Sequence, residues 1–99
     1  MNRYFFEKDD YVQHRYGGVY QFVGHATDTA TGQEVVVYAH VWPFDDKLFT
    51  RPSSEFYDGR FARLTDIEFI ELKKAYSLEQ MQDSIKHNKA NGLTFGKSV

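Results

Sequence analysis

The run from Glu34 to Trp42, EVVVYAHVW, limits the fold of this chain more than any other stretch. It is the longest run that favours β-structure, because Val and aromatic side chains suit a pleated, half-buried surface. Alternate side chains of a strand point to opposite faces. We expect the aliphatic face to pack on the core and the ring-bearing face to meet another layer or a partner. The first face is Val35, Val37, Ala39 and Val41, and the second is Val36, Tyr38, His40 and Trp42.

The composition is that of one globular domain. With 99 residues, of which 41% are hydrophobic and 26% charged, the chain has the usual size and polarity of a single domain. It contains no cysteine, which rules out disulfides and thiolate chemistry and fits a reducing cytoplasm. No run of about 18 apolar residues is present, and the N-terminal apolar run is too short for a signal peptide. We therefore expect a cytoplasmic protein with no membrane partner.

The charge balance narrows the class of partner. The formal net charge is −2, and acidic and basic residues are mixed along the chain. Binding to duplex DNA relies on concentrated Lys and Arg that neutralise phosphates, so we expect no duplex DNA partner. One or two arginines remain able to recognise a small anion.

Other short β-favouring runs surround the central one. Pro43 cannot donate to a β-ladder and should end the central strand, and Gly17-Gly18 should form a turn. Strands spaced by roughly ten residues are typical of a small β-barrel or a strongly bent sheet. The further strands are expected over residues 11–16, 19–25, 47–51 and 60–64.

From Thr65 onward the pattern indicates helices. Thr65 and Glu68 have the spacing of a capping box, as do Ser77 and Gln80. A strand over 67–72 is the alternative for the first of these segments. We predict a mainly β fold with C-terminal α structure. It comprises a small β-barrel over residues 1–64, one or two helices over 65–92 and a frayed tail over 93–99.

Several separated motifs resemble the DUF1653 family, a bacterial and phage family of unknown function. The resemblance covers about residues 11–63 in matching order and implies an SH3-like small β-barrel, with no established chemistry. Arg15-Tyr16 and Trp42-Pro43 depart from the family pattern. Small phage domains of this kind suggest an inhibitor or a sequestering protein. The motifs are HRYGGVYQFVGHA from His14, TATGQEVVVY from Thr29, Arg51-Pro52 with Phe56, and Arg60-Phe61.

Arg51 is the first candidate for a binding residue. A guanidinium binds phosphate or carboxylate through two hydrogen bonds and stacks on rings, and rings beside it offer platforms for a nucleobase. The alternative is a structural role, in which Arg51 fixes a loop through a carbonyl or Glu55. We predict a ligand site formed by Tyr38, His40, Trp42, Phe49, Arg51, Phe56 and Arg60.

The sequence indicates binding rather than catalysis. No serine lies in a nucleophile motif, no glycine-rich phosphate loop precedes a helix, and no pair of His residues has the spacing of metal ligands. We expect a non-enzymatic module without cofactor, metal or catalytic residue, whose partner is a small nucleotide-like anion. A protein partner on the same aromatic patch and single-stranded RNA are the alternatives.

The predicted helical tail carries more apolar side chains than one narrow helical stripe can bury. They would be buried either against the ring-bearing strand face, which completes a monomer, or against a second copy of the chain. We expect a homodimer, because the first arrangement would cover the rings proposed for binding. The side chains are Phe69, Ile70, Leu72, Tyr76, Leu78, Met81 and Ile85.

Overall fold

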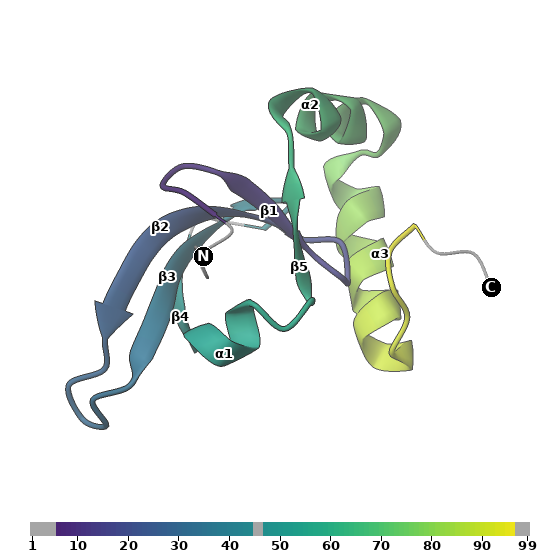
Figure 1. The fold of residues 1–99 in the computed structure, drawn as a ribbon. Helices are drawn as coiled ribbons and strands as arrows, with labels where there is room; N and C mark the ends of the chain where they lie inside the picture. Colours follow the sequence, from purple (N-terminus) through teal and green to yellow (C-terminus); the bar gives the residue numbers. More distant parts are fainter. Residues whose placement is uncertain (1–5, 45–46, 97–99) are drawn as a thin grey trace.

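A computed structural model describes residues 6–44 and 47–96, which form one antiparallel sheet followed by helices (Figure 1). The strands lie in the order β4-β3-β2-β1-β5, so that β4 and β5 are the two edges. The fold is mainly β with C-terminal α, as predicted, and the sheet is consistent with a small open barrel. The strands are β1 (Tyr11–His14), β2 (Val19–Thr27), β3 (Glu34–Trp42), β4 (Leu48–Pro52) and β5 (Phe61–Leu64). The predicted N-terminal barrel segment includes residues 1–5, which lie outside the described ranges.

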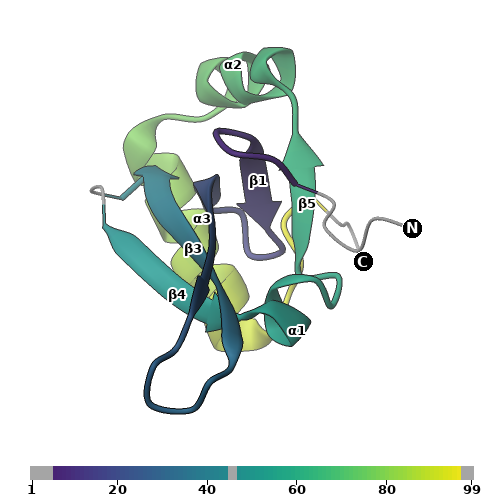
Figure 2. The ribbon, with the colours of Figure 1, turned by 60° about the vertical axis from the view of Figure 1, so that its left-hand side comes forward.

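The two C-terminal helices begin where their capping residues predicted. The single turn α1 (Ser53–Phe56) connects β4 to β5 (Figure 2). Thr65 caps α2 (Asp66–Ala75) and Ser77 caps α3 (Leu78–Asn91), each in a complete capping box. These helices confirm two helical segments and exclude the strand considered for residues 67–72. No helix within the described ranges is long and apolar enough to span a membrane.

The core lies on the ring-bearing face of β3, so the predicted orientation of this strand is wrong. Val36 and Tyr38 are buried in the main cluster, whose other members are Phe6, Val12, Phe22, Phe56 and Phe61. Of the predicted aliphatic core face only Val35 is buried, and its three other members are half-buried. The ring-bearing face is the inner one because seven apolar residues, five of them aromatic, must fill one small core, and large rings supply most of its buried area.

One of the two irregularities in the β2–β3 pairing changes the face of the sheet on which Trp42 lies. Val19 pairs with Trp42 whereas Tyr20 pairs with His40, so β3 has one extra residue, Val41, at this point. Because an extra residue reverses the alternation, Trp42 leaves the face that His40 occupies. Its ring instead packs on Phe69 of α2, with the ring centroids 6.1 Å apart.

Helix α3 docks beside the β1–β2 turn (Figure 1). Met81 is fully buried, and a Cβ placed on Gly17 would lie 2.9 Å from its terminal methyl group. The amide of Asn88 donates to the carbonyl of Tyr16 at 3.1 Å, and that of Gln82 donates to the carbonyl of Pro43 at 2.8 Å. These contacts hold the second helix of the tail against the sheet of its own chain.

The segment after α3 also packs on the sheet. The backbone N–H of Phe95 donates to the carbonyl of Arg15 at 2.7 Å, and the Phe95 ring contacts Tyr76. Residues 93–96, which we expected to fray, are thus held in place. Residues 97–99 of the predicted frayed tail lie outside the described ranges.

Candidate functional site

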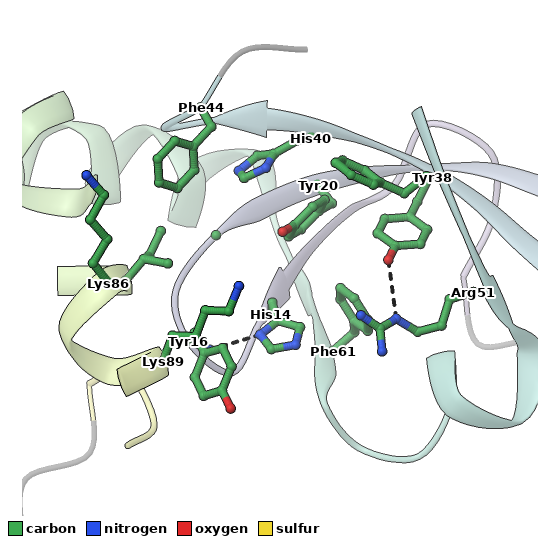
Figure 3. A pocket seen from close by; sticks show the side chains of 13 residues that line it. His14, Tyr16, Tyr20, Tyr38, His40, Phe44, Arg51, Phe61, Lys86 and Lys89 are labelled. Carbon is green, nitrogen blue, oxygen red and sulfur yellow. Dashed lines mark hydrogen bonds between the residues drawn. The ribbon is translucent and has the colours of Figure 1, made fainter. Parts of the chain in front are cut away.

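A cavity of about 410 Å³ lies between the inner face of the sheet and α3 (Figure 3). Its volume falls in the usual range for small-molecule sites, which is about 300–1,000 Å³. The sheet side is a continuous set of rings, and α3 supplies the facing wall through Ile85, Lys86 and Lys89. The rings that line the cavity are Tyr16, Tyr20, Tyr38, Phe44, Phe49 and Phe61, together with His14 and His40.

Tyr20 lies at the centre of these rings. Its ring contacts Tyr38 and Phe61 edge-on, with centroids 5.3 and 5.8 Å apart, and lies 4.2 Å from His40. Burial raises the pKa of the Tyr20 hydroxyl above its usual value, so this group keeps its proton and can donate a hydrogen bond. Mutual packing of the rings fixes their orientation before any ligand arrives, which lowers the entropy lost on binding.

Arg51 enters the cavity from β4 with its orientation fixed. Its Nε donates to the hydroxyl of Tyr38 at 3.2 Å, and its Nη1 lies 3.6 Å from a carboxylate oxygen of Glu55. The pairing with Glu55 is the structural role that the sequence left as an alternative. The Tyr38 bond nevertheless holds the guanidinium at the cavity, where Figure 3 shows it beside Phe61.

His14 is a neutral hydrogen-bonding group at the cavity wall. Its Nδ1 accepts the backbone N–H of Tyr16 at 3.1 Å, so the proton of the neutral ring resides on Nε2. Burial, followed by the positive charges of Arg51, Arg15 and Arg60, lowers the pKa of His14 to about 4. At neutral pH His14 therefore offers an N–H donor without adding a charge.

The structure brings together four of the seven predicted site residues. Tyr38, His40, Phe49 and Arg51 line the cavity, and Arg60 lines a second pocket that shares Arg51 with it.

Two predicted site residues take other positions. Trp42 packs on α2, because the extra residue Val41 puts its side chain on the other face of the sheet. Phe56 is fully buried below the cavity, stacked on Phe61 at a centroid distance of 4.3 Å, and belongs to the core.

The sequence reasoning missed several lining residues. Tyr20 and Phe61 follow the strand alternation and could have been found by pairing the inner faces of neighbouring strands. The three residues of α3 could not, because their position depends on how the helix docks on Gly17, far away in the sequence. Within the described part of the chain, no three His, Asp or Glu residues group as metal ligands.

Comparison with known proteins identifies the family but no characterised relative. Neither a curated protein nor a solved structure matches this chain. The family model described as "Protein of unknown function (DUF1653)" matches residues 10–62, more than half of the chain. This segment contains all five strands except the last two residues of β5, and it ends before α2 and α3. The chain belongs to the DUF1653 family.

Proposed function

We propose that this chain is a non-enzymatic cytoplasmic module that binds a small anionic molecule with a planar ring, such as a nucleotide. In this proposal the curved sheet is the SH3-like barrel that the family resemblance implies, and the cavity beneath α3 holds the ligand. A binding protein of this size would act by sequestering its ligand or by inhibiting the process that uses it. The observation that carries the proposal is the cavity itself, which combines a wall of rings with three cationic side chains.

The rings support recognition of a planar group. A nucleobase stacked on aromatic side chains gains about 1–3 kcal/mol per base, and every base has a face that can stack. Phe49 is the most exposed ring of the set, at 38%, and lies at a centroid distance of 5.8 Å from Tyr38. It is therefore the ring that we expect to contact a bound base most directly.

The cations support recognition of an anion. The chain as a whole is slightly negative, yet Arg51, Lys86 and Lys89 all line the cavity. Its described lining contains no carboxylate, although Glu55, outside that lining, lies 3.6 Å from Arg51 and partly neutralises it. A ligand with a negative group could place that group between β4 and α3 while its ring rests on the sheet.

The shape of the site favours a small molecule over the two alternatives. The rings face inward beneath α3, whereas a protein-binding patch presents its aromatic side chains outward to the partner. Single-stranded RNA needs a groove that follows several nucleotides. A cavity of about 410 Å³ has room for a single base and sugar rather than for a strand.

Native mass spectrometry of the purified protein tests the proposal by detecting a bound small molecule. Calorimetric titration with the four nucleoside monophosphates then measures binding directly. Substituting Phe49→Ala should weaken the tightest of these complexes by about tenfold, because it removes a stacking surface. Arg51→Gln should weaken it at least as much, because it removes the charged donor.

Trp42→Phe provides the control, because Trp42 is an aromatic residue on the neighbouring strand β3 that does not line the cavity. Its affinity should equal that of the unmodified protein. If Trp42→Phe weakened binding and Phe49→Ala did not, the ligand would bind elsewhere. If the protein bound none of the four monophosphates, the nucleotide proposal would be wrong.

A further inference from the structure

A second pocket adjoins the cavity and is lined by three arginines. It has a volume of about 420 Å³, and its described lining includes Arg15, Arg51 and Arg60. His14, Tyr16 and Arg51 line both this arginine pocket and the ring-lined cavity, so the two spaces meet along these side chains. A molecule bound in the cavity could therefore extend into the arginine pocket past Arg51.

The arginine pocket concentrates positive charge well beyond what the chain carries on average. Five of the twelve Lys and Arg residues line the two pockets together, although the formal net charge is −2. All three guanidiniums act on His14 strongly enough to contribute to its lowered pKa. Their fields therefore overlap at the boundary between the two pockets.

A carboxylate of the chain itself already occupies part of this pocket. Asp58 binds Arg60 through both carboxylate oxygens, with Nη2 to Oδ2 at 2.7 Å and Nε to Oδ1 at 3.0 Å. Asp58 is also the one acidic residue among the described lining of this pocket. The two side chains are 37% and 33% exposed, so solvent screens the pair and an incoming anion can compete with Asp58. The geometry at Arg60 is that of guanidinium pairing with a carboxylate or phosphate.

We propose that the arginine pocket binds a second anionic group of the same ligand, so that the ligand is a nucleoside diphosphate or triphosphate. The ring lies in the cavity, the first phosphate meets Arg51 at the boundary, and the following phosphates reach Arg15 and Arg60. This inference rests on the proposed function of the cavity and adds the class of ligand. It assigns a binding role to Arg15 and Arg60, which take no part in the proposed stacking of the ring.

Calorimetric titration with matched mono-, di- and triphosphates of one nucleoside tests the inference, using each of the four common bases in turn. The buffer contains EDTA, so that the phosphates are not masked by divalent metal. In the unmodified protein the diphosphate should bind about tenfold more tightly than the monophosphate. Arg60→Gln should reduce that ratio to near one, because it weakens the diphosphate complex much more than the monophosphate complex. Asp58→Asn should tighten the diphosphate severalfold, because it removes the competing carboxylate.

Lys86→Gln is the matched control, since Lys86 lines the ring-lined cavity and not the arginine pocket. It should alter the affinities for mono- and diphosphate by the same factor. Equal affinity for both in the unmodified protein, or equal weakening of both by Arg60→Gln, would overturn the inference and leave the proposed function standing. Binding of no nucleotide in the series would overturn the inference and the proposed function together. Circular dichroism and thermal melting of each variant establish that it is folded.

Discussion

At the scale of single residues, His14 couples the charge of the site to the stability of the fold. Its pKa falls from the usual 6.5 to about 4 in the folded protein, because burial and three arginines disfavour the imidazolium. In the unfolded chain His14 takes up a proton as the pH falls below about 6.5, whereas the folded protein does so only near pH 4. Acid therefore favours the unfolded state across this interval.

We predict that the free energy of unfolding of the wild-type protein falls by about 1–2 kcal/mol more than that of His14→Gln between pH 7 and pH 4, because solvent at the partly buried imidazole screens part of the effect. Glutamine cannot titrate, so the difference between the two proteins isolates His14 from the carboxylates. Urea denaturation followed by circular dichroism at several pH values measures this difference. Parallel pH curves for the two proteins would show that the imidazole is not held neutral in the fold.

A second residue-scale prediction concerns the bond from Arg51 to Tyr38. Tyr38→Phe keeps the buried ring and removes only the hydroxyl that accepts from Arg51 Nε at 3.2 Å. We expect a loss of about 1 kcal/mol in stability and a several-fold loss in nucleotide affinity, since the guanidinium loses its fixed orientation. In the Arg51→Gln background the same substitution should change nucleotide affinity little. Equal effects in both backgrounds would show that the hydroxyl acts independently of Arg51.

At the scale of secondary-structure elements, the docking of α3 depends on the β1–β2 turn. Gly17 has φ of 123°, a region that side chains rarely adopt, and an added Cβ would meet Met81, Phe95 and Ile85. Met81 is fully buried and has little room to move away. The close packing of Gly17 on α3 is therefore needed for this helix to form the wall of the cavity that faces the sheet.

We predict that Gly17→Ala destabilises the protein by about 1–2 kcal/mol more than Gly59→Ala does. Gly59 has a similar φ of 101° but open space where its Cβ would lie, so the backbone cost is shared and the excess reports the contact with α3. Thermal or urea unfolding of the two variants measures the difference. Equal destabilisation would mean that α3 accommodates the methyl group without cost.

The same scale shows what the sequence could predict and what it could not. Local signals were sufficient for the ends of three elements. Thr65 and Ser77 start α2 and α3, and Pro43 ends β3, each at the predicted position. The inner face of β3 could not be assigned in this way. Strand alternation defines two faces but does not say which is inside, and the extra residue at Val41 depends on pairing with another strand.

At the scale of the whole molecule, the tail divides its apolar residues between the sheet and the surface. Phe69 and Met81 are buried within the chain, whereas Ile67, Ile70 and Leu78 are 72%, 49% and 53% exposed. The dimer expected from the sequence remains a prediction, and these exposed side chains define the surface through which it would form. The cavity itself is complete within one chain.

We predict a dimer of about twice 11.6 kDa in light scattering at micromolar concentration. Ile67→Glu should reduce it to a monomer without lowering nucleotide affinity, because it places a charge on the exposed side of α2 away from the cavity. Leu48→Glu is the matched control, since Leu48 is equally apolar and 70% exposed but lies on β4. If the unmodified protein runs as a monomer, the expected dimer is wrong.

The family match ends before the helix that forms one wall of the cavity, which bears on the selectivity of the proposed site. Residues 10–62 supply the ring-lined side of the cavity, whereas Ile85, Lys86 and Lys89 come from a helix beyond that segment. The fully buried residue that anchors the same helix, Met81, does not line the cavity. Part of the lining of the cavity is thus encoded outside the segment that forms the sheet. We therefore expect substitutions of Lys86 and Lys89 to change which ligands the proposed site accepts, while the sequence of the sheet and the anchoring residue stay as they are.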